Sequence, residues 1–166
     1  EIIHPEDLVV WPIWRNGMKK DFKLVKEKGC ATIVGLGALN EEIEADIAVG
    51  SQWELPKDFK PEDFLIKFPR IIATDNENGA REYTAAGVIT QPALPANVVD
   101  TTGAGDSFLA GFLTGYALGI TPGKVLLEIG ARWASLMVTI DASIPPNFYE
   151  IEGIQEIIDK ALQESK

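Results

Sequence analysis

A glycine-rich turn between an apolar pair and a helix-like pattern constrains this chain more than any other feature. The turn reads Gly103-Ala104-Gly105 and follows Val98 and Val99. The apolar residues that come next recur at spacings of three and four, which predicts a helix: Leu109, Phe112, Leu113 and Tyr116. The first N–H groups of a helix lack intrahelical acceptors, and the helix dipole adds positive charge there. The turn is therefore expected to bind an anion such as phosphate.

Asp106 closes this turn and falls at the start of the predicted helix. A carboxylate beside a phosphate site can accept the proton of a hydroxyl that attacks a phosphoryl group. The alternative is that Asp106 only caps the helix, because Asp is favoured at the N-cap position. For a short Gly-x-Gly-Asp motif alone, capping is the better interpretation.

The longer string over residues 100–108, Asp-Thr-Thr-Gly-Ala-Gly-Asp-Ser-Phe, resembles the second signature of the ribokinase, or PfkB, family of carbohydrate and nucleoside kinases. The resemblance implies ATP-dependent phosphoryl transfer to a hydroxyl of a sugar, polyol or nucleoside. It implies that Asp106 is the catalytic base. It also implies that the amides of Gly103, Ala104 and Gly105 form the anion hole for the transferred phosphate.

A second stretch resembles the family's strand followed by Asn-x-x-Glu. A strand pattern at 45–49 leads into Ser51-Gln52-Trp53-Glu54, with Ser51 at the Asn position. The resemblance implies that Glu54 helps to hold Mg²⁺ through water. An equally weighted alternative is that Glu54 is a surface residue at the start of a helix.

Two further loops resemble family elements that border the nucleotide. Thr74 ends a predicted strand at 70–74, Asn76 and Gly79 follow it, and Asn76 stands where the family has glycine. Without the resemblance, this loop would be interpreted as a plain Asn-Gly turn. The run after Asp141 resembles the closing loop beside the adenine, which implies that Ala142 lies near the nucleotide.

The same resemblance raises the question of a monovalent cation. It points to K⁺ held through Asp100 and Thr102, although the closing loop departs from the family pattern at Ala142 and Pro146. The expected cofactors are therefore ATP and Mg²⁺, with K⁺ left open.

Apolar runs alternate with helical patterns along the chain, apart from one predicted hairpin over 81–90. This alternation indicates an α/β fold with a mostly parallel sheet and helices on both faces. The resemblance adds the ribokinase-like fold. We expect a single α/β domain over 1–166, equivalent to the nucleotide-binding C-terminal part of such a kinase, with the N-terminal acceptor-binding part absent from this sequence.

Three further local features of the helices are expected from the sequence. A short acidic helical turn is expected at 41–44, and a helix is expected to begin with Thr121 as N-cap and Pro122 as its first residue. Glycines recur every fourth residue after the signature, which predicts a smooth helix stripe in close contact with a neighbour: Gly111, Gly115 and Gly119.

Composition limits the partners. The formal net charge is −10, which argues against nucleic acid, because phosphate backbones are bound by Lys and Arg. No apolar run approaches 18 residues, so no membrane span is expected. The single Cys30 suits a reducing compartment, and we expect a cytoplasmic protein whose partner is a small-molecule hydroxyl acceptor. A homodimer is left open. Two rivals remain: a non-catalytic nucleotide-binding module, and a structural fragment that needs a partner.

Overall fold

The computed structural model describes residues 3–141, 151 and 153–164. Its strands are β1 (Leu8–Trp11), β2 (Ala31–Gly35), β3 (Ile47–Ser51), β4 (Arg70–Thr74), β5 (Ala80–Thr84) and β6 (Gly87–Gln91). Its α-helices are α1 (Lys19–Glu27), α2 (Pro61–Phe64), α3 (Ala104–Ala117), α4 (Gly123–Met137) and α5 (Ile154–Glu164). Short 3-10 helices are η1 (Asn16–Met18), η2 (Leu36–Asn40), η3 (Gln52–Glu54) and η4 (Asn76–Asn78).

The chain divides into two compact units. Unit 1 comprises Glu1–Ala73 and Glu82–Val88, and unit 2 comprises Thr74–Arg81 and Ile89–Lys166. The strands form one six-stranded sheet in the order β1-β2-β3-β4-β5-β6. β2 pairs in parallel with both β1 and β3, in a register that places Val10 opposite Ile33 and Val34 opposite Ala48.

The connections after β4 are too short for a parallel crossover, which needs a dozen residues or more. Five residues join β4 to β5 and two join β5 to β6, so these strands run antiparallel. The predicted hairpin is therefore confirmed. The predicted α/β fold with a mostly parallel sheet is confirmed as well.

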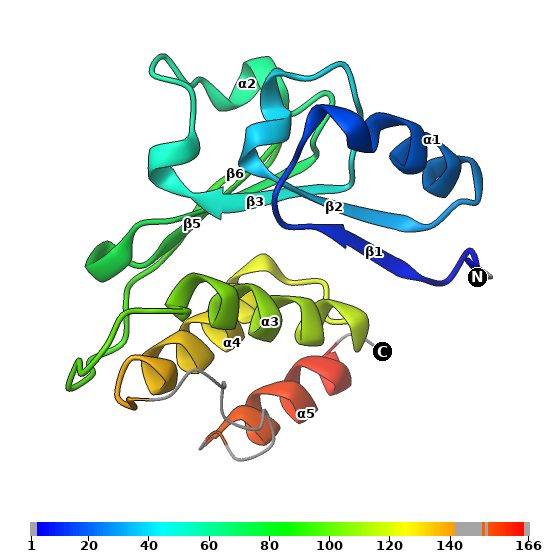
Figure 1. Ribbon diagram of the computed structural model, residues 1–166. Coiled ribbons are helices and arrows are strands. Elements are labelled where there is room, and N and C mark those ends of the chain that lie inside the picture. Colours follow the sequence, from blue (N-terminus) through cyan, green and yellow to red (C-terminus); the bar gives the residue numbers. More distant parts are fainter. Residues whose placement is uncertain (1–2, 142–150, 152, 165–166) are drawn as a thin grey trace. The chain divides into compact units, whose positions relative to one another are not determined.

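Packing in unit 1 centres on the helix that connects β1 to β2. α1 buries Phe22 and Val25, three residues apart, and most of its remaining residues are charged. Figure 1 shows α1 lying alongside β2. The ring centroids of Trp11 and Trp14 lie 5.3 and 5.5 Å from that of Phe22. Both tryptophans thus pack against α1.

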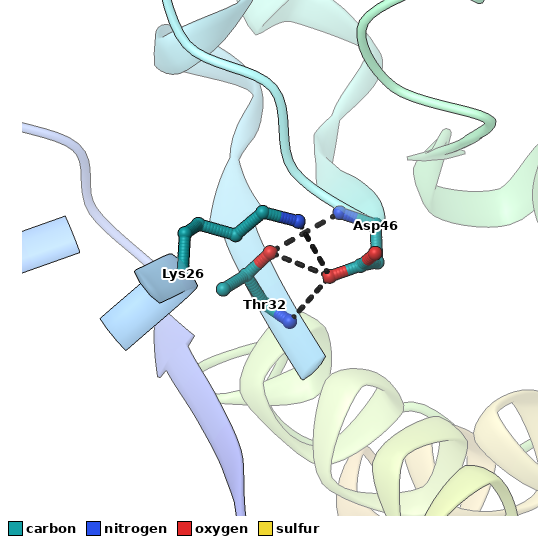
Figure 2. Close-up of polar contacts among 3 residues, drawn as sticks. All are labelled: Lys26, Thr32 and Asp46. Carbon is teal, nitrogen blue, oxygen red and sulfur yellow. Dashed lines mark hydrogen bonds and ion pairs between the residues drawn. The ribbon is translucent and has the colours of Figure 1, made fainter. Parts of the chain in front are cut away.

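A polar cluster ties the beginnings of β2 and β3 to α1 (Figure 2). Asp46 Oδ2 accepts hydrogen bonds from the Thr32 backbone N–H at 2.7 Å and from Thr32 Oγ1 at 2.6 Å. Lys26 Nζ lies 3.4 Å from the same oxygen. Burial alone would raise the pKa of Asp46, but the Thr32 hydrogen bonds and the Lys26 charge outweigh it and lower the pKa.

This cluster predicts an acid-sensitive contribution to stability. A carboxyl whose pKa is lowered on folding stabilises the fold fully above its ordinary pKa of 3.8, and that contribution is lost as the pH falls through the folded-state value. Asp46→Asn should reduce the free energy of unfolding at pH 7 and flatten its decline between about pH 5 and pH 2. Denaturant titrations across this range would measure it. Asp58→Asn, at an exposed carboxylate of unit 1, is the control and should keep the pH dependence of the wild type. If the stability of Asp46→Asn declined with falling pH as steeply as that of the wild type, the assignment to Asp46 would be contradicted.

In unit 2, glycines let α3 and α4 approach each other closely. A Cβ at Gly111 would lie 3.1 Å from the Ile129 carbonyl oxygen, and one at Gly130 would lie 2.9 Å from the Phe108 carbonyl oxygen. The glycine stripe is therefore confirmed as a helix contact for Gly111 and Gly115. Gly119 lies beyond the end of α3 and adopts φ 83°, so it ends the helix.

The contact between α3 and α4 predicts an unusual response to alanine. Alanine normally stabilises a helix interior relative to glycine by about 1 kcal/mol. Gly130→Ala should instead destabilise the protein by about 1–3 kcal/mol, because the new methyl group meets both the carbonyl oxygen and the buried ring of Phe108, neither of which can move aside easily. Equilibrium unfolding should show this loss. Gly17→Ala, where no atom lies within 4 Å of the added Cβ, should be near neutral; equal effects of the two substitutions would contradict the packing argument.

Two local expectations were wrong. Residues 41–44 form no helix, because Glu41 is extended (φ −94°, ψ 160°) and closes η2 instead. Thr121 is not the N-cap of α4. Pro122 takes that place with extended backbone, and its carbonyl accepts the first helical hydrogen bonds from Val125 and Leu126.

Candidate functional site

The signature turn takes a left-handed conformation at its first glycine. Gly103 is the N-cap of α3, with φ 77° and ψ 1°, and its carbonyl accepts the Ser107 N–H at 2.8 Å. Residues with a Cβ rarely adopt this conformation, so glycine suits the position for its backbone freedom. Gly105 differs: it is helical, and a Cβ added there would have no other atom within 4 Å. Its lack of a side chain therefore keeps the space beside the turn open.

The free donors of the turn lie in the first residues of α3. The Ala104 N–H donates to the Thr101 carbonyl oxygen at 3.2 Å. Within the described residues, the N–H groups of Gly105 and Asp106 donate no hydrogen bond, as expected for the first turn of a helix. An anion at this turn would thus meet Gly105 and Asp106 before Ala104.

The C-terminal end of α4 holds the signature segment in place. The Val138 carbonyl accepts the N–H groups of Val99 at 2.7 Å and Asp100 at 3.3 Å. Asp100 Oδ1 then accepts the Thr102 N–H at 2.9 Å, and hydrogen bonds from Thr102 lower the pKa of Asp100. These contacts fix the course of the chain immediately before Gly103. A monovalent cation at Asp100 and Thr102 stays a prediction.

Asp106 is an exposed residue in the first turn of α3. It is not the helix cap, because Gly103 holds that position and no side-chain cap hydrogen bond is present. The capping alternative is therefore wrong. The carboxylate of Asp106 belongs to the same helix turn as the free N–H groups, which is the placement that the catalytic-base interpretation requires.

The loop after β4 belongs to unit 2 with the signature. Thr74 ends β4, and the Asp75 N–H donates to the Gly79 carbonyl at 2.7 Å to close the loop. Gly79 adopts φ 93°, and a Cβ there would lie 2.6 Å from the Ala93 nitrogen. The loop is a five-residue connection with a 3-10 turn rather than a two-residue Asn-Gly turn, so that simpler alternative is wrong.

The backbone conformation of Asn76 is one that glycine, the residue expected here from the resemblance, would also adopt. Asn76 has φ 44°, in the left-handed region. Glycine adopts this region freely, and Asn is the side chain that enters it most readily. The substitution of Asn for glycine therefore preserves the backbone conformation that the family's glycine would allow.

Glu54 lies in unit 1, at the end of η3 and just after β3. Its Oε2 accepts the Ser51 N–H at 2.7 Å, and the residue is exposed. This is the local structure of a helix-start residue, as the alternative predicted, and it leaves the carboxylate accessible. In proteins Mg²⁺ usually keeps several waters and binds mainly substrate phosphates with one or two carboxylates. A single exposed carboxylate fits that mode of binding.

Gly50 is a residue of this region that the sequence interpretation missed. A Cβ at Gly50 would lie under 3.0 Å from Glu54 Oε2. The available signal was a glycine inside a strand pattern, which often marks a close approach. Ala142 lies outside the described residues. No cluster of three or more His, Cys, Asp or Glu suited to a metal occurs in the described part of the chain, and none of its helices is long and apolar enough to span a membrane.

The backbone of Asn76 predicts a clear ranking of substitutions. Asn76→Gly should be tolerated, whereas Asn76→Val should destabilise the protein by about 1–3 kcal/mol, because a β-branched residue is strained at positive φ. Equilibrium unfolding would measure both. Asn78→Val changes an exposed residue of the same turn that has negative φ, and it should cost less than Asn76→Val. Equal losses at the two positions would contradict the left-handed assignment.

Comparison with known proteins places the chain in a family. A family model described as pfkB family carbohydrate kinase matches residues 60–147. Fructoselysine 6-kinase of Escherichia coli (strain K12) is 47% identical over 51 residues, which are 31% of this chain and 20% of that protein. The nucleoside kinase of Methanocaldococcus jannaschii is 41% identical over 81 residues, which are 48% of this chain and 26% of that protein.

Solved structures show the same fold over a longer stretch. The nucleoside kinase of Burkholderia thailandensis in complex with ADP-inosine superposes with a TM-score of 0.75 at 23% identity, covering 94% of this chain and 54% of that one. The chain thus spans about half the length of this structure and a fifth to a quarter of the two curated relatives. The ribokinase-like fold predicted from the signature is confirmed. Because the family model covers more than half of its residues, this chain belongs to the pfkB family of carbohydrate kinases.

Proposed function

We propose that this chain forms the nucleotide-binding and catalytic part of an ATP-dependent kinase that phosphorylates a hydroxyl of a sugar, polyol or nucleoside. The observation that carries the proposal is the first turn of α3. An exposed carboxylate, Asp106, stands there together with the free N–H groups of Gly105 and Asp106. A base and an anion site in one helix turn are the two parts that phosphoryl transfer to a hydroxyl requires.

In this mechanism, Asp106 accepts the proton of the acceptor hydroxyl as its oxygen attacks the γ-phosphorus of ATP. The bond to the β–γ bridging oxygen breaks, and ADP leaves. The free N–H groups and the helix dipole stabilise negative charge on the phosphoryl oxygens. Bound Mg²⁺ would supply further positive charge to the phosphates, and Glu54 is the residue that would hold it through water.

Other parts of unit 2 hold the N–H donors of α3 in place and leave space beside them. The Val138 carbonyl fixes the backbone before Gly103, so the donors are held in position before the nucleotide binds. Gly105 leaves the space beside the donors unfilled. A preorganised donor set is worth more than a flexible one, because no reorganisation is needed as charge develops. The loop formed by Thr74, Asn76 and Gly79, together with Ala142, is proposed to border the nucleotide.

Similarity to known proteins supports a nucleotide and leaves the acceptor open. The Burkholderia structure contains ADP-inosine. The two curated relatives described above are a fructoselysine 6-kinase and a nucleoside kinase, so their names point to acceptors of different chemical classes. We therefore propose ATP as the phosphoryl donor and keep the acceptor as a small hydroxyl compound.

The central prediction concerns Asp106. In the full-length protein with its acceptor, Asp106→Asn should lower kcat by about 10²–10⁴-fold, the usual range for a general base, while ATP affinity changes little. Coupled ADP-release kinetics and calorimetry would separate the two. Glu156→Gln is the matched control, because Glu156 is an exposed acid in the first turn of α5.

Two outcomes would contradict the proposal in different ways. An Asp106→Asn variant that keeps more than half of the wild-type kcat would remove the base from the mechanism. A wild-type protein that binds ATP but transfers phosphate to no sugar, polyol or nucleoside would favour the non-catalytic nucleotide-binding module instead.

A further inference from the structure

We propose that Gly50 is a positioning residue for the metal-binding role of Glu54: by having no side chain, it lets the Glu54 carboxylate fold back onto the Ser51 N–H. The inference rests on the proposed function, because Glu54 matters to catalysis only if the protein binds Mg²⁺ with a nucleotide. It adds a residue that the family resemblance did not point to.

The geometry leaves no room for a side chain at position 50. A Cβ there would approach Glu54 Oε2 to under 3.0 Å on one side and would lie 3.1 Å from Leu36 Cγ on the other. Leu36 is fully buried, with 1% of its surface exposed, so it cannot move aside readily. Glu54 is exposed, and its carboxylate is the flexible end of a side chain. An added methyl group would therefore displace the carboxylate and leave the core in place.

The displaced contact is the one that orients Glu54. The Ser51 N–H holds Oε2 at 2.7 Å, and no hydrogen bond within the described residues engages Oε1. With one oxygen fixed, the other is presented in a defined direction to solvent, where a metal-bound water can donate to it. A group that hydrogen-bonds to a metal ligand, as Glu54 would to a metal-bound water, typically changes metal affinity by 10–100-fold when it is removed, so displacing the Glu54 carboxylate should cost part of that affinity.

This arrangement also gives Ser51 a function at the position where the family has Asn. Ser51 contributes through its backbone N–H, which every residue except proline possesses. The Ser51 side chain takes part as well, because it accepts the backbone N–H of Glu54 and so completes a capping box with the Glu54 carboxylate. Gly50 leaves the space into which this carboxylate folds back.

The direct test measures metal affinity on the full-length protein. Mn²⁺ replaces Mg²⁺ as the probe, and electron paramagnetic resonance reports its binding to the protein–ADP complex. Gly50→Ala should weaken Mn²⁺ binding by about tenfold, the lower end of the range for an orienting group. Gly37→Ala is the matched control, because no atom lies within 4 Å of a Cβ at that position. It should bind Mn²⁺ as the wild type does.

A double-mutant cycle distinguishes positioning from a general effect on the fold. Glu54→Gln removes the charge that Gly50 is proposed to orient. If Gly50 acts through Glu54, adding Gly50→Ala to Glu54→Gln should change Mn²⁺ affinity by less than about twofold, since residues that act through one another are not additive. An undiminished tenfold effect in the double variant would overturn the proposal. So would wild-type Mn²⁺ affinity in the Gly50→Ala variant.

A structural readout separates this inference from the proposed function. The Ser51 amide proton, bonded to a carboxylate, should move upfield in the NMR spectrum of the nucleotide-free Gly50→Ala variant, with the melting temperature close to that of Gly37→Ala. An unchanged Ser51 resonance would overturn the inference alone. Wild-type protein that binds no Mn²⁺ with ADP would overturn the proposed function, and the metal-binding role of Gly50 with it.

Discussion

The candidate site depends on one backbone conformation, the left-handed Gly103 that begins α3. With Gly103 at φ 77°, the chain turns into the helix so that Gly105 and Asp106 occupy its first turn. The Val138 carbonyl holds the chain before this turn through Val99 and Asp100. A different conformation at this point would move the start of α3. The donors and the carboxylate would then no longer share one helix turn.

The packing of α3 on α4 makes that turn rigid. At Gly111 and Gly130 the backbone of one helix lies directly against atoms of the other helix. This close packing leaves α3 and α4 little freedom to slide past each other. The carbonyl that anchors the signature segment belongs to the C-cap of α4, so the same helix that packs against α3 also holds the segment before it. Stability and site geometry in unit 2 therefore rest on the same pair of helices.

The sequence allowed most elements to be predicted, because apolar periodicity and glycine turns are local signals. β3, β4, α3 and the hairpin of β5 and β6 follow from such patterns. The failures have physical causes. Glu41 to Glu44 are acidic enough to suggest a helix start, but η2 precedes them and the chain leaves it in an extended conformation. Pro122 is compatible with both helical and extended backbone. The surrounding sequence therefore does not determine whether Pro122 is the N-cap of α4 or its first helical residue. Gly50 was missed because its role depends on the approach of Glu54, which spacing alone does not reveal.

Asn76 carries a lesson for how sequence motifs are written. Its left-handed φ of 44° indicates that the position requires a left-handed backbone conformation rather than one particular residue type. Since Gly, Asn and Asp are the residues that enter this state most readily, they form one equivalence class at the position. A search profile that scores the class as a match would recognise chains such as this one. A profile that accepts only glycine would score such chains lower, although the backbone conformation at the position is the same.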